Sequence, residues 1–233
     1  MRMWLALVHK EVEEQRGFWA LLLGGSVLLE AYAAIRVPEH MGAALVAFLP
    51  LWGILLLIPF RFAQSMAMER RGQTMHLLHS LPVSLSVPLV SKLAVFLVGG
   101  IVTTGVALGG IYLVYGQVES VLRFPGVPQV SGEQVLAFSG LGTMSAMVLL
   151  TGVTTASEGV RTSLHRLRWL GAGAFLLGTF LAYVFLLSDG VQVFTAAPIF
   201  GDGMGHSFFA YTFSFGLCWG AIGVFLFQRC SEV

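Results

Sequence analysis

Long runs of apolar residues, separated by short polar segments, dominate the pattern of this chain. Each run can form a helix of about 20 residues, the length that crosses a hydrocarbon core of about 30 Å. We therefore expect six transmembrane helices with the approximate bounds Phe18–Ile35, Ala43–Phe60, Leu93–Tyr115, Val135–Ala156, Trp169–Leu187 and Phe208–Phe227. The connections leave no room for a soluble domain, so residues 1–233 are expected to form a single all-α integral membrane domain.

The first 17 residues differ from these runs because charged and apolar positions are mixed. Trp4, Val8 and Val12 recur at four-residue spacing, with charged residues between them. This pattern predicts an amphipathic helix over residues 1–17 that lies at the membrane interface and leads into the first span. A cleaved signal peptide is the alternative, but acidic residues such as Glu11 do not fit the basic start of such a peptide.

Lysine and arginine are distributed unevenly between the two sides of the predicted spans. Of the 13 Lys and Arg residues, Arg36 and Arg123 fall on one side. All the others fall on the opposite side: Arg2, Lys10, Arg16, Arg61, Arg70, Arg71, Lys92, Arg161, Arg166, Arg168 and Arg229. Basic residues favour the cytoplasmic side of membrane proteins. We therefore expect both termini in the cytoplasm and the protein in the cell (plasma or inner) membrane.

Three segments are expected on the outer side, and they differ in character. Val37–Gly42 is short enough for a tight turn. Gly116–Gln134 contains prolines and glycines, which is typical of an irregular loop. Ser188–Ser207 mixes apolar residues with acidic residues and glycines, so it could form a re-entrant or interfacial element that is buried in protein.

Composition supports the membrane assignment and excludes several classes of function. Hydrophobic residues make up 56% of the chain and charged residues 11%, whereas soluble domains carry about 25% charged residues. Nothing indicates nucleic-acid binding, because the net charge is +1 and basic residues occur in short clusters. The chain contains neither GxxxxGK[ST] nor HExxH. We therefore expect no catalytic residue, no metal site and no cofactor in this chain.

Glu30 is the one acidic residue well inside a predicted span. A carboxylate within the membrane is costly and often marks a functional site, which makes Glu30 a candidate for a substrate path or a proton pathway. Tyr32 and Arg36 lie close in sequence and could pair with it or hold it at the interface. A structural role is the simpler alternative.

Two further patterns have structural explanations. Gly105 with Gly109, and Gly216 with Gly220, have the GxxxG spacing that permits close helix packing. We expect this packing within the chain rather than at a specific dimer contact. His76 and His79 could share a helix face, but two ligands do not make a metal site, so we expect a solvated face there.

The polar segment between the second and third spans, residues 64–86, has the features of a separate short helix. Gly72 can break the helix that extends from the second span, Thr74 can cap the next helix, and Pro82 can end it. Three charged residues precede this helix: Glu69, Arg70 and Arg71. Three leucines are available on it: Leu77, Leu78 and Leu81. The periodicity fits a helix that docks on a partner and equally one that lies on lipid headgroups.

The same segment resembles a family signature. The similar residues are Glu69, Gly72, Thr74, Leu77, Leu78, the run Ser80-Leu81-Pro82-Val83-Ser84, and Ser91-Lys92-Leu93. They look like the pattern E-x-x-G-T/S-x-x-x-L-L-x-S-L-P-V-S…K-L that follows the second span of ABC-type-2 permeases, the membrane subunits of many ABC exporters. One departure is Gln73, which separates Gly72 from Thr74 where the family usually joins them directly. The stretch His9-Lys10-Glu11 leading to Trp19 is similar to the interfacial helix of that family.

The resemblance implies an ABC-2 type exporter fold and a function in transport. This chain would be a permease subunit, not an enzyme by itself, within a complex that hydrolyses ATP. A separate ABC ATPase subunit would bind ATP and Mg²⁺ and dock on the coupling helix. A second permease chain, identical or related, would complete the path across the lipid membrane. The coupling residues implied are Glu69, Arg70, Arg71, Gly72, Thr74, Leu77, Leu78, Leu81 and Pro82.

Other classes of function remain open from the residues alone. A stand-alone secondary transporter or channel would need ionisable groups in the membrane, and Glu30 is the one candidate. A haem-exporter-like subunit of cytochrome maturation is similar in size and number of spans. A membrane enzyme is disfavoured because the catalytic motifs are missing. The sequence does not identify the transported substrate.

Overall fold

The computed structural model describes residues 2–36, 43–71, 86–119, 132–163, 168–195 and 204–230, and all regular structure within these ranges is helical. The helices are α1 (Arg2–Arg36), α2 (Ala43–Val46), α3 (Leu49–Arg71), α5 (Ser86–Glu119), α6 (Gly132–Ser163), α7 (Arg168–Phe185), α8 (Leu187–Thr195) and α9 (Met204–Cys230). Five of them, α1, α3, α5, α6 and α9, are long and apolar enough to cross a membrane, and α7 is shorter. For the described residues, the prediction of an all-α chain with several helices able to cross a membrane is thus confirmed.

The second long helix starts later than the sequence pattern predicts. We expected a span over Ala43–Phe60, but α2 ends at Val46 and α3 begins at Leu49. Pro50 lies in the first turn of α3, where its missing N–H group costs no helical hydrogen bond. The apolar part of α3 extends to Met68, and the helix reaches Arg71, directly before Gly72, where the sequence predicted a break.

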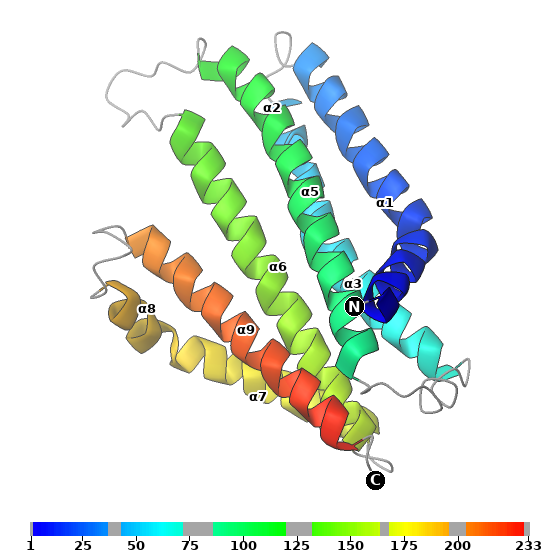
Figure 1. The fold of residues 1–233 in the computed structure, drawn as a ribbon. Helices are drawn as coiled ribbons and strands as arrows, with labels where there is room; N and C mark the ends of the chain where they lie inside the picture. The colour runs from blue at the N-terminus through cyan, green and yellow to red at the C-terminus, as the bar shows by residue number, and fades with distance from the viewer. Residues whose placement is uncertain are drawn as a thin grey trace.

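The first helix is continuous from Arg2 to Arg36, so the predicted interfacial helix and the first span form one element. In Figure 1 the first turns of α1, in dark blue, bend away from the axis of the remaining helix. Glu11 and Gln15 pack inward and are buried, while Trp4 and Val12 are more than two-fifths exposed. The apolar side of this segment is thus free to contact lipid.

Side-chain contacts fix the direction of the helices in one half of the molecule. Glu11 pairs with Lys92 and the Glu30 carboxyl group lies over Gly110, so α1 and α5 run parallel. The ring of Phe62 on α3 stacks edge-on against Phe96 on α5, with centroids 5.5 Å apart. Since Ser65 meets Lys92 and the earlier residue Phe62 meets the later residue Phe96, α3 runs antiparallel to α5.

In the other half, α6 and α9 run parallel and side by side (Figure 1). Gly152 lies against Gly216, and Gly159 lies against Gly223. The helix α7 runs antiparallel to α9, because Phe175 contacts Trp219 with ring centroids 5.0 Å apart and Tyr183 contacts Tyr211 at 5.4 Å. The chain therefore leaves the end of α6, returns along α7 and enters α9 from the same end as it entered α6.

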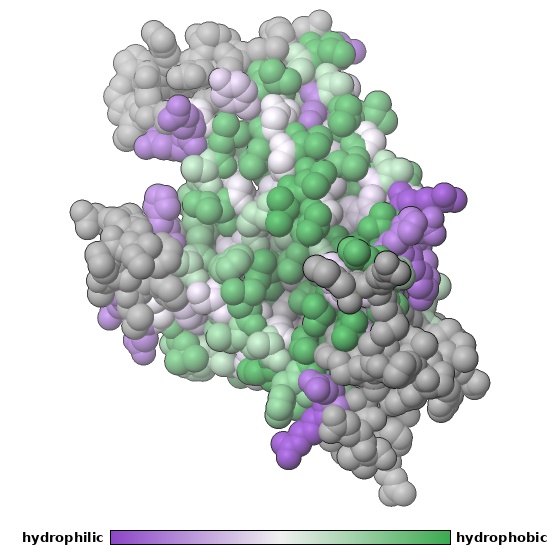
Figure 2. Space-filling model, viewed as in Figure 1, coloured by the Kyte–Doolittle hydropathy of each residue, from purple (hydrophilic) through white to green (hydrophobic). Residues whose placement is uncertain are grey.

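The core lies where α3, α5 and α6 meet. Its largest fully buried apolar side chains are Ile54, Ile58, Phe62, Phe96, Ile111 and Met147. Outside this core many large apolar side chains are exposed, for example Leu28 (73%) and Phe185 (76%). Figure 2 shows hydrophobic side chains over the broad middle of the molecule and hydrophilic ones towards its rims. This distribution is that of a protein whose middle contacts lipid.

The element that follows α7 packs against α9. Hydrogen bonds from Leu186 to Ala182 and from Gly190 to Leu186 continue the helix across the joint into α8. Gly190 lies directly under the ring of Tyr211 on α9, and the Tyr211 hydroxyl donates to the backbone oxygen of Tyr183 at 3.0 Å. We predicted a re-entrant or interfacial element in this region, and its described part is a short helix held against the beginning of α9.

Candidate functional site

The predicted coupling segment is described only at its two flanks. Glu69, Arg70 and Arg71 are the last residues of α3, and the structure describes no more of them than this helical position. The remaining predicted coupling residues lie outside the described residues: Gly72, Thr74, Leu77, Leu78, Leu81 and Pro82. The geometry around the segment therefore comes from the end of α3 and the beginning of α5.

A buried ion pair lies between the last turns of α3 and the first turns of α5 and α1. Lys92 on α5 donates from Nζ to Oε2 of Glu11 on α1 at 2.7 Å, and both side chains are almost completely buried. The same ammonium group donates to Oγ of Ser65 on α3 at 3.0 Å. One lysine thus joins three helices, and we call Glu11, Ser65 and Lys92 the three-helix joint.

The three-helix joint is sensitive to the loss of either charge. Removing two charges from water costs several kcal/mol per ion, and their attraction offsets this cost only when the geometry is good. A single remaining charge would stay buried without its partner, at a cost of about 3–5 kcal/mol. The joint connects α3 and α5, the two helices that flank residues 72–85, to each other and to α1.

A second set of polar contacts lies next to the joint. Arg61 on α3 donates from Nε to Oε1 of Gln15 on α1 at 2.9 Å and from Nη1 to Oε1 of Gln64 at 2.8 Å. A cavity of about 330 Å³ opens beside these groups. It is lined by Lys10, Glu14, Gln15, Arg61, Ser65, Met68 and Lys92. We call this space the Arg61 cavity.

A polar pair also marks the end of α6. Glu158 is buried, and its Oε1 lies 3.4 Å from Nη1 of Arg161. Gly159 contacts the backbone of Gly223, which places this pair beside the last turns of α9. The end of α6 and the end of α9 therefore lie together, as do the end of α3 and the beginnings of α1 and α5.

Glu30, the predicted candidate within the membrane, is buried on α1 at 8% exposure. Its carboxyl group lies directly over Gly110 of α5, where a β-carbon would overlap it. Among the described residues Oε1 of Glu30 has no hydrogen-bond partner, so the pairing with Tyr32 or Arg36 that the sequence allowed does not satisfy this atom. A buried carboxylate oxygen without a partner is costly and suggests a ligand, a proton or a conformational role.

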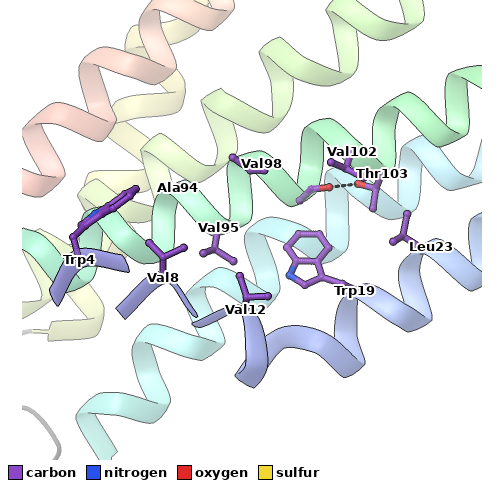
Figure 3. A pocket seen from close by; sticks show the side chains of 11 residues that line it. Trp4, Val8, Val12, Trp19, Leu23, Ala94, Val95, Val98, Val102 and Thr103 are labelled. Atoms are coloured by element: carbon purple, nitrogen blue, oxygen red, sulfur yellow. Dashed lines mark hydrogen bonds between the residues drawn. The ribbon is translucent and has the colours of Figure 1, made fainter. Parts of the chain in front are cut away.

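An apolar groove of about 320 Å³ lies between α1 and α5 (Figure 3). Trp4, Val8 and Val12 line its end near the start of α1, and the indole of Trp19 reaches across to α5. Gly99 allows this approach, because a β-carbon there would overlap the indole. The lining is almost wholly apolar, so the groove can take a hydrocarbon chain but offers no chemistry that selects one.

The three-helix joint was not predicted from the sequence. Its members are separated by 81 and 27 positions, so no local motif connects them. One signal was available: Lys92 directly precedes the apolar run that begins at Leu93, so a carboxylate at the same depth would stabilise it. Glu11 and Gln15 also share a helix face with i, i+4 spacing, which would have indicated a polar side turned towards the protein.

The described residues contain no group of three or more His, Cys, Asp or Glu side chains that could hold a metal ion. His76 and His79 lie outside these residues. Comparison with protein-family models, curated proteins and solved structures finds no match to this chain. The functional assignment therefore depends on the sequence pattern and on the geometry above.

Proposed function

We propose that this chain is the membrane-spanning permease subunit of an ATP-driven ABC exporter, coupled through residues 69–82 to a separate ATPase subunit. The observation that supports this proposal best is the three-helix joint. A coupling segment transmits force only if its two ends are attached rigidly to helices that cross the membrane. Lys92 provides this attachment at the base of the segment through its 2.7 Å ion pair with Glu11 and its 3.0 Å hydrogen bond to Ser65.

The proposed mechanism contains no covalent step in this chain. ATP binding would close two partner ATPase subunits, and their movement would displace the coupling segment. The displacement would pass to α3 and α5 directly and to α1 through Lys92 and Glu11. Two copies of this permease, or this chain with a related one, would then switch the path between them from inward-open to outward-open.

The first test is purification of this protein from its own host membranes in a mild detergent. The proposal predicts a stoichiometric partner that carries GxxxxGK[ST], together with ATP hydrolysis that vanadate inhibits. Recovery of this chain alone, without hydrolysis even after crosslinking, would contradict the proposal.

The second test is the variant Leu78→Asp, which places a charge on the predicted docking surface. We expect loss of the ATPase subunit from the purified complex, with normal amounts of this chain in the membrane. Leu122→Asp, in the predicted outer segment, is the matched control and should retain the partner. Equal retention of the ATPase by both variants would exclude residue 78 from the coupling surface.

The second candidate function is a stand-alone transporter coupled to a cation or proton. The observation that favours it is the buried Oε1 of Glu30, which lacks a partner among the described residues. This alternative predicts that the protein recovered alone dissipates a pH or cation gradient in liposomes and that Glu30→Gln abolishes the flux. The exporter proposal predicts no such flux in the absence of the ATPase.

A further inference from the structure

The Arg61 cavity contains a positive charge that no acidic side chain offsets among the described residues. Three cations line it, but two have carboxylate partners: Lys92 pairs with Glu11 at 2.7 Å and Lys10 pairs with Glu14 at 3.4 Å. Arg61 instead donates to two neutral amide oxygens, those of Gln15 and Gln64. Counting the described side chains, the cavity therefore carries one net positive charge, located on the guanidinium group.

The contacts of Arg61 leave part of its donor capacity available. An arginine has five N–H groups in a planar fork. Nε and Nη1 each make one of the two bonds described, which fixes the plane of the guanidinium and leaves Nη2 without a described partner. A planar fork with free donors suits a carboxylate or a phosphate, and Arg is preferred where such groups are bound with two hydrogen bonds.

Ser65 supplies a second donor to the same cavity. Its Oγ accepts a hydrogen bond from Lys92, so its own hydrogen is free to be donated. Ser65 lies one helical turn after Arg61 on α3, and both line the cavity. An anion in the cavity would meet the guanidinium, a hydroxyl donor and the partly neutralised ammonium groups of Lys10 and Lys92.

The location determines which anions can reach this site. Arg61, Ser65 and Met68 occupy the last turns of the apolar part of α3, and Lys92 lies near the start of that of α5. If these apolar parts cross the hydrocarbon core, the cavity lies within about two helical turns of its rim, close to the lipid headgroups. Basic pockets between membrane helices at this level bind anionic headgroups. Its volume of about 330 Å³ falls within the range of small-molecule sites, roughly 300–1,000 Å³.

We propose that the Arg61 cavity binds a phosphate group, with Arg61 as the main ligand and Ser65 as a hydrogen-bond donor. The most direct source is the headgroup of an anionic phospholipid, and free phosphate has the same chemistry. The site requires only that the protein lies in a membrane, and it does not depend on the exporter proposal. Because α1 and α3 both contribute to the cavity, a bound phosphate would strengthen their contact beside the three-helix joint.

The test measures lipid adducts of the purified full-length chain by native mass spectrometry in a maltoside detergent. Phosphatidylglycerol is compared with diacylglycerol that has the same acyl chains, and inorganic phosphate is tested separately by thermal unfolding. We expect preferential binding of phosphatidylglycerol and at least a tenfold loss of this binding in Arg61→Gln, as for a charge-assisted pair of hydrogen bonds. Arg229→Gln, at the exposed end of α9, is the matched control and should bind normally.

The lipid and phosphate measurements together have three possible outcomes. Phosphatidylglycerol binding that depends on Arg61 supports a lipid headgroup as the source. A rise in unfolding temperature with inorganic phosphate that depends on Arg61, without a lipid preference, supports the phosphate site with a soluble source. Equal binding of both lipids together with no phosphate effect, or equal losses in Arg61→Gln and Arg229→Gln, would overturn the proposal. If Arg61→Gln does not fold, Lys10→Gln removes an exposed lining cation and should reduce binding by a smaller factor.

Discussion

Single charged residues determine how the first helix sits against the rest of the molecule. The sequence identified Glu30 as an unusual carboxylate, because one acidic residue within an apolar run is visible without a structure. It did not reveal that Glu11 and Lys92 form a pair, because the two lie on helices that are distant in sequence. Periodicity predicted that Trp4, Val8 and Val12 lie on the apolar side of an interfacial helix, but it did not show which polar residues face the protein. The structure buries Glu11 and Gln15, whereas Trp4 and Val12 remain exposed, as a lipid environment allows.

The variant Lys92→Met tests the three-helix joint. We expect it to lower the free energy of unfolding by about 3–5 kcal/mol, because Glu11 would remain buried without its cation. Thermal or denaturant unfolding in detergent measures this change. Lys10→Met is the matched control, since its pair with Glu14 is about half exposed and should contribute less than about 1 kcal/mol.

The double variant Glu11→Leu with Lys92→Met separates the effect of an unpaired charge from a general effect of substitution. An apolar pair of similar size can replace a buried ion pair at little cost. We therefore expect the double variant to be more stable than Lys92→Met alone. If the two losses simply add, the charges do not interact and the joint has no energetic role.

Glu30 and Gly110 form a second residue-scale pair that a double-mutant cycle can test. A methyl group in Gly110→Ala would overlap the Glu30 carboxyl group, which must then move. Because this group is the end of a flexible side chain, we expect a loss of only about 1 kcal/mol of stability. In a Glu30→Ala background the overlap is absent and Gly110→Ala should cost nothing. An equal loss in both backgrounds would show that another contact limits the space at Gly110.

At the scale of elements, the sequence predicted which segments are helical more accurately than where each helix begins and ends or which helices it contacts. The shift of the second span to Leu49 follows from Pro50, which favours a helix start and which an apolar-window argument ignores. The two GxxxG patterns illustrate the second limit. Gly216 and Gly220 pack against α6 within the chain, as predicted, whereas no other described part of the chain comes within 4 Å of a β-carbon placed at Gly105 or Gly109. The GxxxG spacing indicates a helix face that lacks large side chains. It does not indicate which helix packs against that face.

The contact between α6 and α9 can be tested with glycine substitutions. A β-carbon at Gly223 would lie 2.5 Å from the backbone nitrogen of Ala156, which cannot move without displacing α6. We expect Gly223→Ala to cost about 1–3 kcal/mol in the free energy of unfolding. Gly105→Ala is the control and should cause no loss, because the space around it is open. Comparable losses in both variants would indicate a general effect of alanine on these helices rather than close packing.

For the whole molecule, the distribution of charge and the directions of the helices agree. Glu11, Ser65 and Lys92 meet at one end of the molecule, and the starts of α1 and α5 lie there with the end of α3. The start of α1 and the end of α9 both lie in the lower half of Figure 1. Arg161 and Arg229 lie in the last turns of α6 and α9, whose ends lie together, and the positive-inside argument predicts that basic residues gather on one side in this way. The sequence could predict this arrangement because it depends on the order of apolar and basic segments alone.

The lengths of the helices alone do not determine how many times the chain crosses the membrane. Five helices meet the criterion for a span, which would place the two termini on opposite sides. The helix α7 has 18 residues and is therefore about 27 Å long, slightly less than a hydrocarbon core of about 30 Å. However, α6 and α9 run parallel, so the chain must return between them. The antiparallel contacts of α7 with α9 indicate that α7 is this return.

We therefore predict six crossings and both termini on the cytoplasmic side. Reporters that fluoresce only in the cytoplasm, fused to the N-terminus in one strain and to the C-terminus in another, should both be fluorescent. A periplasmic phosphatase fused after residue 195 should be active, because α8 would lie on the outer side. Termini on opposite sides would mean that α7 does not cross, and the parallel packing of α6 and α9 through Gly152 and Gly216 would then be wrong as well. The topology and the Gly223→Ala measurement thus test the same helix contact by independent means.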